Sequence, residues 1–382
     1  MAVTMPAAAQ PDPQPRVIVE GLAFPTGIAF TSDGARMFVN ERPGRMLVVD
    51  ERRRDVREVA RVETTTAGET GLLDLAVSPN DRFVYAFVTD PSGTSNRVVR
   101  VPIDGGDVEV VVDDLPASVY HNGGGVAFDA DGMLLVSNGE NHNESRAQDP
   151  DERGGKVYRF TPEGAPAPGN PFGESIALGL RNPFGLTVDP VTGDAFVTEN
   201  GVSSHDEINR VVVGGNYGWP EIEGSSDGAR PSGPGDYVDP LLDYPEVIVP
   251  TGIAIADPAN APDDVAGDVF FGGYLDGAVH RLELNDDRSQ AVSDNVIARE
   301  DSGIVAVAWG PHGLYYSTTD AVKLIPLASA SSNDAAETAR APLVGPPLRP
   351  PENANANLYL LLGGAALIVV IGAGWIVVRR RR

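Results

Sequence analysis

Short apolar runs recur along most of the chain, each led by glycine and ended by a turn. The unit is a Gly-led apolar run, an Asp-Gly or Pro-containing turn and a second apolar run. It occurs as TGIAFTSDGARMFVNE, GLLDLAVSPNDRFVYAFVTD, GGVAFDADGMLLVSNG, FGLTVDPVTGDAFVTEN, TGIAIADPANAPDDVAGDVFFGG and GIVAVAWGPHGLYYSTTD. Most copies are followed by a further strand-like run, so each supplies several antiparallel strands.

This repeat predicts a β-propeller. A period of about 45 to 65 residues built from hairpins is typical of propellers, because a single blade cannot bury its own faces. The content of 43 Gly and 32 Pro fits many turns rather than long helices. We therefore expect an all-β, six-bladed β-propeller over residues 17–327. Tandem β-sandwiches would explain the strands, but not the recurrence of one Gly-led hairpin.

The C-terminal residues 358–378 form an uncharged apolar run, LYLLLGGAALIVVIGAGWIVV. At 1.5 Å per residue a helix of this length crosses a hydrocarbon core about 30 Å thick. The four arginines at 379–382 follow at once, and the positive-inside rule keeps such residues in the cytoplasm. The pattern predicts a single-pass protein of the cell membrane with an extracytoplasmic propeller. A tail-anchored protein with a cytoplasmic domain is the competing topology.

The segments that flank the predicted propeller differ from it in composition. Residues 1–16 contain AAAQ, which resembles the small-residue end of a signal peptide. We expect either a residual signal-peptide end, with the true start upstream, or a disordered N-terminus. Residues 328–357 are rich in Ala, Pro, Asn and Ser, which is typical of an extended tether.

Charge and cysteine content narrow the possible functions. The formal net charge of -25 repels polyphosphate, so no nucleic-acid partner is expected. The chain has no cysteine, which excludes disulfides, thiolate metal sites and cysteine nucleophiles.

The loops that precede the Gly-led runs carry the candidate chemistry, because such loops converge at the axis of a propeller. They bring one group of polar side chains toward one end of that axis: Glu69, His121, Asn122, Arg181 and Asn182. A lone histidine before a strand is often structural, but His121 gains possible partners here. Elsewhere we expect His142 to be an exposed loop residue and Trp219 a packing residue.

Five longer stretches are specific enough for comparison with known families. They are ETGLLDLAVSP, HNGGGVAFDADG, GGKVYRFTPEG, LRNPFGLTVDP and ENGVSSHDEINRVVVGGNYGWP. In this order they resemble the soluble quinoprotein glucose and sorbosone dehydrogenase family, which includes aldose sugar dehydrogenases, from about Val17 to Leu327. The resemblance implies a six-bladed propeller that binds pyrroloquinoline quinone (PQQ) and calcium over its axis.

The resemblance also implies roles for particular residues. His121 matches the base that takes the hydroxyl proton while a hydride moves to the quinone, and Arg181 matches the cation beside the quinone oxygen. The cofactor-binding residues implied are Glu69, Arg181 and Asn182. The calcium ligands implied are the backbone carbonyls of Gly201 and Val202.

The sequence departs from the family where basic residues hold the cofactor's three carboxylates. Leu275 and Asp276 replace one basic pair, residues 302–305 replace the basic motif before the last blade, and Arg299 is the cation that remains nearby. Each lost charge-assisted contact contributes about 1.5 to 3 kcal/mol.

Three hypotheses follow. The first is a membrane-anchored aldose dehydrogenase that uses PQQ with calcium and passes electrons from a sugar to a membrane acceptor. The second is a noncatalytic surface propeller that binds a protein or glycan and has lost the cofactor. A calcium-dependent propeller hydrolase or lactonase is a weaker third.

Overall fold

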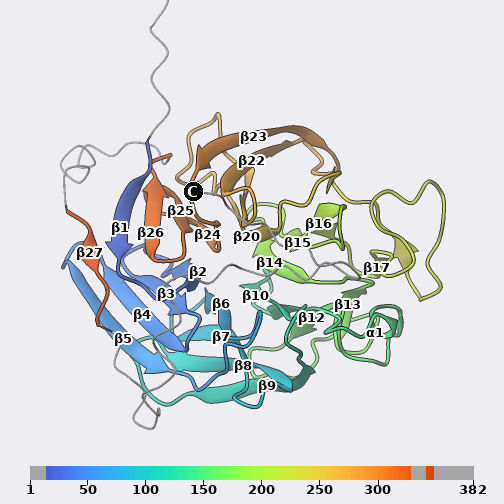
Figure 1. Ribbon diagram of the computed structural model, residues 1–382, viewed down its shortest axis with the longest axis horizontal. Coiled ribbons are helices and arrows are strands. Elements are labelled where there is room, and N and C mark those ends of the chain that lie inside the picture. The colour runs from blue at the N-terminus through green and yellow to red at the C-terminus, as the bar shows by residue number, and fades with distance from the viewer. Residues whose placement is uncertain (1–13, 328–340, 348–382) are drawn as a thin grey trace, which may run out of the picture.

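The computed structural model describes residues 14–327 and 341–347, and its sheets surround a central axis (Figure 1). The strands of each sheet are given from the axis outward. The first sheet consists of β2 (Pro25–Phe30), β3 (Met37–Glu41), β4 (Arg45–Asp50) and β5 (Asp55–Arg61), and the second of β6 (Leu72–Val77), β7 (Phe83–Thr89), β8 (Ser95–Pro102) and β9 (Glu109–Pro116). The third consists of β10 (Gly123–Phe128), β11 (Leu134–Asn138), β12 (Lys156–Phe160), β13 (Ser175–Leu178), β17 (Gly215–Asn216) and β18 (Asp236–Tyr237). The short helix α1 (Ser145–Gln148) lies between β11 and β12.

Three further sheets complete the circle. The fourth sheet consists of β14 (Pro183–Val188), β15 (Ala195–Glu199), β16 (Asp206–Val211) and β19 (Leu242–Tyr244). The fifth consists of β20 (Pro250–Ile255), β21 (Val269–Gly273), β22 (Ala278–Leu284) and β23 (Ala291–Arg299). The last consists of β24 (Val307–Gly310), β25 (Gly313–Ser317), β26 (Ala321–Ile325), β1 (Arg16–Glu20) and β27 (Leu343–Val344). The inner strands β2, β6, β10, β14, β20 and β24 contact one another in this order, and β24 contacts β2. The described chain is therefore a closed β-propeller.

The glycines of the inner strands let neighbouring sheets approach closely around the axis. A Cβ atom on Gly185 in β14 would lie 2.3 Å from the carbonyl oxygen of Thr251 in β20. A Cβ atom on Gly252 would lie 2.5 Å from the backbone nitrogen of Val307 in β24. The recurrence of glycine in the repeat thus has a steric cause.

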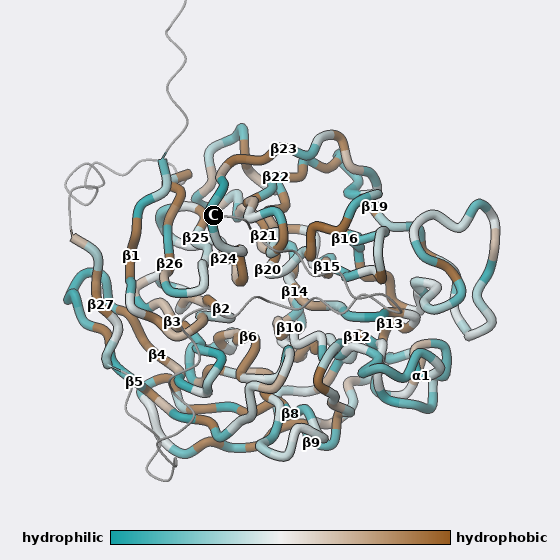
Figure 2. The backbone as a smooth tube through the Cα atoms, in the orientation of Figure 1, coloured by the Kyte–Doolittle hydropathy of each residue, from teal (hydrophilic) through white to brown (hydrophobic). Residues whose placement is uncertain are grey.

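The apolar cores lie between adjacent sheets. Successive residues of a strand point to opposite faces. Met37 and Val39 of β3 therefore pack toward the sheet that contains β24 and β1, which we call the closing sheet, while Phe38 packs toward the β6–β9 sheet. All three side chains are buried. Figure 2 shows apolar residues along the strands around the ring.

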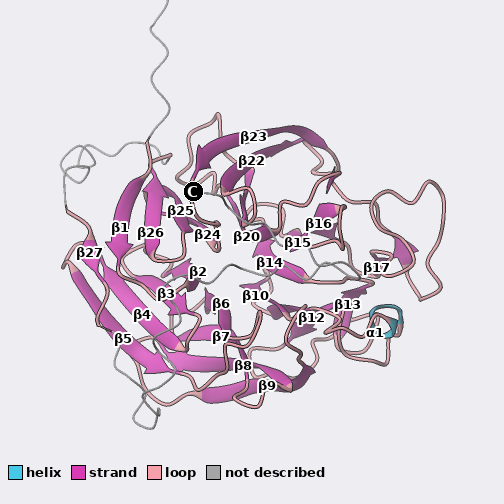
Figure 3. Ribbon diagram, viewed as in Figure 1, coloured by secondary structure: helices cyan, strands magenta, loops and turns pink. Residues whose placement is uncertain are grey.

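The structure corrects the predicted fold class in two respects. Five sheets follow chain order from the axis outward, whereas the last is a composite of both ends of the described chain, so the repeats do not form six equivalent blades. Within the described residues no helix is long and apolar enough to cross a membrane, and α1 has 4 residues (Figure 3). The predicted span 358–378 and tail 379–382 lie outside the described residues.

The composite sheet forms because β1 pairs antiparallel with β26 and parallel with β27. Strand β27 comes from residues 341–347, within the predicted tether. Leu343 is 8% exposed, and the Gly345 nitrogen donates to the Glu20 carbonyl at 2.8 Å. We call residues 341–347 the C-terminal strap.

A buried ion pair holds the end of the strap. Glu41 and Arg45 are almost fully buried and form an ion pair. Arg45 Nη1 also donates to the carbonyl oxygen of Pro346 at 2.7 Å, while Glu41 Oε1 accepts a hydrogen bond from the Ala23 nitrogen at 2.8 Å. The ion pair therefore links the strap to the chain just before β2.

We predict that the strap stabilises the propeller. Leu343→Ala should lower the free energy of unfolding by about 2 to 4 kcal/mol, because it removes a buried side chain. The neighbouring Val344 is 68% exposed, so Val344→Ala should change it by less than about 0.5 kcal/mol. Urea denaturation measures both.

A chain ending at Leu327 should likewise unfold at lower urea than one ending at Pro347. Equal midpoints for these two chains, or for the two alanine variants, would show that the strap contributes nothing.

Candidate active site

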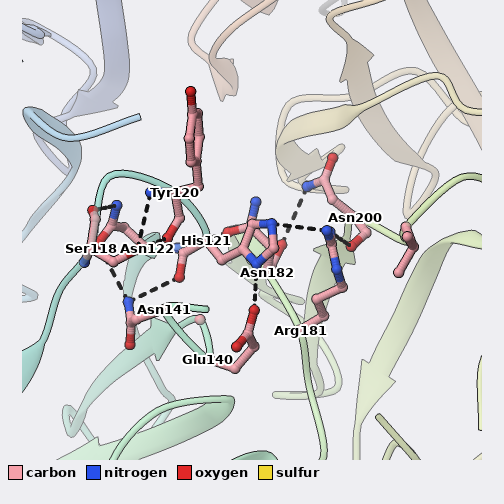
Figure 4. A network of polar contacts seen from close by, with 12 residues as sticks. Ser118, Tyr120, His121, Asn122, Glu140, Asn141, Arg181, Asn182 and Asn200 are labelled. Carbon is pink, nitrogen blue, oxygen red and sulfur yellow. Dashed lines mark hydrogen bonds and ion pairs between the residues drawn. The ribbon is translucent and has the colours of Figure 1, made fainter. Parts of the chain in front are cut away.

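The loops before the inner strands place the predicted residues at one end of the axis, which we call the mouth. Glu69 precedes β6, His121 precedes β10, and Arg181 with Asn182 precedes β14. Figure 4 shows His121, Arg181 and Asn182 close together. The closed ring thus brings together side chains that are far apart in sequence.

Every nitrogen and oxygen atom of His121 has a polar partner. Its Nδ1 contacts the Glu140 carboxylate, and its Nε2 lies 2.8 Å from Arg181 Nη2 (Figure 4). Its backbone nitrogen donates to Glu69 Oε2 at 2.8 Å, and its carbonyl oxygen accepts hydrogen bonds from the nitrogen and Nδ2 of Asn141. These contacts stabilise a backbone with φ of 57°, which is uncommon for a residue with a side chain.

Arg181 connects this histidine to the next loop. Its Nη1 donates to the carbonyl oxygens of Asn200 and Gly201, both at 2.8 Å. Its guanidinium carbon lies 5.4 Å from the ring centroid of Trp219, so Trp219, expected to be a packing residue, also supports the cation. The buried Arg181 Nε has no partner among the described residues.

Asn182 and Glu199 fix the backbone of the Arg181 loop. Asn182 Oδ1 accepts a hydrogen bond from the Gly123 nitrogen at 2.9 Å. Glu199 Oε1 accepts from the nitrogens of Arg181 and Asn182 at 3.2 and 2.6 Å. Burial of Glu199 raises its pKa well above 4.5, because the charged carboxylate loses its hydration.

The predicted calcium ligands lie in the loop between β15 and β16. The carbonyl oxygen of Gly201 accepts a hydrogen bond from Arg181, and the backbone nitrogen of Gly201 donates to Asp206 Oδ1 at 2.9 Å. The Val202 nitrogen donates to Glu223 at 3.2 Å. Across residues 14–327 and 341–347, no three or more His, Cys, Asp or Glu side chains form a group that could hold a metal ion.

Asn122 is turned away from this chemistry. It is 1% exposed, and its Oδ1 accepts hydrogen bonds from Asn96 Nδ2 and the Ser118 nitrogen, both at 3.1 Å. Its Nδ2 donates to the Ser118 carbonyl at 2.7 Å. Asn122 is therefore part of a buried amide network that supports the His121 loop.

The sequence did not reveal two charged residues of the mouth, Glu140 and Arg42. Glu140 is buried beside His121 because Gly123 of β10 pairs with Asn138 of β11, which brings the residues after Asn138 opposite those before Gly123. Aligning the two strands of this hairpin in the sequence would have predicted that Glu140 lies beside His121. Arg42 lies in the loop between β3 and β4.

Arg42 contributes a second cation to the mouth. Its guanidinium carbon lies 5.4 Å from the Phe24 ring, and its Nε donates to the Thr70 carbonyl at 2.9 Å. Burial lowers the pKa of Arg42, and the nearby charge of Glu69 offsets only part of this effect. Arg42 and Arg181 both donate to backbone carbonyls, not to carboxylates, within the part of the chain that the structure describes.

The positions that lack basic residues have other partners. Asp276 accepts from His280 Nε2 at 3.2 Å, and Arg299 Nη1 lies 3.7 Å from it. Although burial lowers the pKa of His280, its hydrogen bonds to Asp276 and Asp294 raise the value to about 9. Leu275 is 56% exposed. Neither 275 nor 276 supplies a cation to the mouth.

A cavity of about 640 Å³ extends along the axis below the mouth. It is lined by inner-strand residues and by the hairpin turns at the opposite end, among them Asp33 and Pro311. Gly123, next to the His121 loop, lines the cavity, but the side chains of His121 and Arg181 do not.

The family model for glucose/sorbosone dehydrogenases matches residues 22–325, which is most of the described chain. The chain belongs to the glucose/sorbosone dehydrogenase family.

Several members of that family are similar along most of their length. The aldose sugar dehydrogenase YliI of Escherichia coli K12 is 27% identical over 332 residues, which cover 80% of this chain and 89% of the relative. The PQQ-bound aldose sugar dehydrogenase of Streptomyces coelicolor is 30% identical, with a TM-score of 0.70, and the match covers 82% of this chain and 98% of that protein. A putative glucose dehydrogenase of Thermus thermophilus is 35% identical, with a TM-score of 0.72, and the match covers 81% and 99%.

We predict that Glu199 makes the stability of this family member depend on pH. A carboxyl whose pKa is raised by folding contributes stability that is complete below its unfolded pKa and is lost as pH rises through the folded value. Glu199→Gln cannot lose a proton. The free energy of unfolding of Glu199→Gln minus that of the wild type should therefore increase from pH 5 to pH 8.5 in urea titrations. A difference independent of pH would contradict the raised pKa.

Proposed function

We propose that this protein oxidises aldose sugars at C1, with PQQ as the electron acceptor and His121 as the base. The observation that carries the proposal is the position of His121 between a buried carboxylate and a guanidinium at the mouth. A histidine paired with a carboxylate is suited to take a proton from a hydroxyl group. The relatives named as aldose sugar dehydrogenases support the same reaction.

The contacts of His121 support Nε2 as the basic nitrogen. A guanidinium can donate but not accept hydrogen bonds, so Nε2 accepts from Arg181 and Nδ1 carries the proton toward Glu140. Nε2 then has the lone pair that takes the hydroxyl proton of the sugar. The carboxylate of Glu140, which is 1% exposed, stabilises the imidazolium that results.

Arg181 must leave Nε2 when the sugar hydroxyl binds there. Its Nη1 keeps the guanidinium near the carbonyls of Asn200 and Gly201, so a small movement suffices. The cation then remains beside the site where negative charge develops.

The residues of the mouth fit an anionic cofactor. The chain has a net charge of -25, yet Arg42 and Arg181 have no carboxylate partner among the described residues, and the buried Nε of Arg181 is unpartnered. These groups, with Asn182, would hold the carboxylates and oxygens of PQQ. When bound, the quinone would take the hydride from C1 of the sugar, which leaves as a lactone.

The same residues do not fit calcium in this arrangement. The Gly201 carbonyl, one of the two implied ligands, lies 2.8 Å from Arg181 Nη1, and a guanidinium and a divalent cation repel each other at one oxygen. The proposed chemistry therefore assigns no step to calcium.

A noncatalytic propeller is the second candidate. It is favoured by Leu275 and Asp276, an apolar and an acidic residue that stand between β21 and β22 in place of a basic pair. It predicts that the domain binds no quinone, whereas the proposed dehydrogenase must bind it.

We predict that the full-length chain takes up PQQ and that Arg42→Gln weakens this binding by about ten- to a hundredfold, because one charge-assisted contact is lost. Equilibrium absorbance titration measures the affinity. Arg82→Gln is the matched control, since Arg82 also overlies a phenylalanine ring, at 5.7 Å from Phe83, but lies in the hairpin between β6 and β7. No uptake by the wild type at micromolar PQQ would exclude the dehydrogenase.

We also predict that His121→Gln and Glu140→Gln reduce turnover of aldoses while PQQ binding largely persists. Loss of the base should cost at least about a hundredfold in kcat, and Glu140→Gln should cost about as much because it fails to stabilise the imidazolium. Dye reduction with saturating glucose gives kcat. Full activity of His121→Gln would assign the base to another residue.

A further inference from the structure

Two aromatic side chains stand beside the catalytic base without a role in its hydrogen bonding. Tyr120 and His142 stack with ring centroids 5.5 Å apart and planes 27° apart. The His142 ring also meets the His121 ring edge to face at 4.4 Å. In Figure 4 Tyr120 extends away from the polar network that surrounds His121.

The loops that carry these two rings are locked together. Ser118 Oγ donates to the Tyr120 carbonyl at 2.6 Å and accepts from the Tyr120 nitrogen at 3.1 Å. Asn141, next to His142, donates twice to the His121 carbonyl. His121, Asn141 and His142 all have φ near 57°. Such backbone strain persists where the surroundings enforce it, and it is often found at ligand sites.

The rings are accessible, and the imidazole is neutral. His142 is exposed and Tyr120 is half-buried, so neither ring is placed by core packing. Loss of hydration lowers the pKa of His142, and the neighbouring His121 lowers it further. At neutral pH the pair therefore offers uncharged aromatic surface, on the parts of the rings that do not stack against each other, with a hydroxyl and an imidazole at the edges. Aromatic rings of this kind bind ligands that have an apolar face and a polar rim.

We infer that Tyr120 and His142 form a platform on which the pyranose ring of the aldose stacks while its C1 hydroxyl reaches His121. A pyranose has a face of C–H groups and a rim of neutral hydroxyls, which matches these two side chains. The contact of His142 with His121 puts a sugar on the platform next to the base. This inference rests on the proposed function for the identity of the ligand, and it assigns sugar affinity to residues outside the proton-transfer pair.

The test separates sugar binding from chemistry. In the PQQ-loaded full-length protein, Tyr120→Ala and His142→Ala should each raise KM for glucose about tenfold, with kcat changed less than about threefold. Tyr120→Phe and His142→Tyr keep a ring and should recover most of the lost affinity. Val191→Ala, at a side chain 70% exposed between β14 and β15, should leave both constants unchanged.

A second measurement does not need turnover. Binding of 1,5-anhydroglucitol, which lacks the C1 hydroxyl, is measured by saturation-transfer NMR on the protein with and without PQQ. The signal should weaken in both alanine variants and return in the ring-keeping variants. Thermal melting checks that each variant is folded.

The outcomes distinguish this inference from the proposed function. If the wild type takes up no PQQ but binds the sugar in a way that the alanine variants weaken, the platform is supported and the proposed dehydrogenase activity is excluded. An active wild type whose alanine variants keep their KM and NMR signal overturns the platform and leaves the dehydrogenase. A fall in kcat at constant KM also overturns it, because the rings would then serve to position His121.

Discussion

The antiparallel pairing of β1 with β26 closes the ring of sheets, and the remaining structure depends on it. Without this pairing the closing sheet has no outer strands, and the apolar core shared by β1, β3 and β25 opens to water. Closure also fixes the distance between loops on different sheets. Glu69, His121 and Arg181 lie in the loops before β6, β10 and β14, which are the inner strands of three successive sheets. Because the closed ring fixes the spacing of these strands, His121 stays within hydrogen-bonding distance of both Glu69 and Arg181.

The mouth gathers several buried ionisable groups within this rigid frame. Glu140 contacts the His121 ring and Glu199 accepts from the Arg181 backbone, and each of these buried carboxyl groups leaves one oxygen unpartnered among the described residues. Buried polar groups that lack partners cost free energy. A site that keeps them is adapted to binding or chemistry at the expense of stability, and the raised pKa of Glu199 is one measure of that cost.

Much of the fold could be predicted from local pattern, because each Gly-led run became an inner strand and the glycines are needed where strands cross near the axis. The convergence of His121 and Arg181 followed from the same repeat. The position of Glu140 depended on the register between β10 and β11, and that of Arg42 on a loop without a distinctive motif. The docking of β27 could not be predicted, since two apolar residues in an Ala- and Pro-rich segment find their place through distant partners such as Arg45.

The parallel pairing of β27 with β1 has a mechanical consequence. The chain approaches β1 from one end of the strand pair and leaves β27 at the opposite end, because the two strands run in the same direction. Tension between the two ends of the described chain would therefore load their backbone hydrogen bonds in shear, all at once, rather than open them one after another. A force applied to the chain beyond Pro347 would therefore be resisted by the pairing of β27 with β1 before the force reached the loop that carries His121.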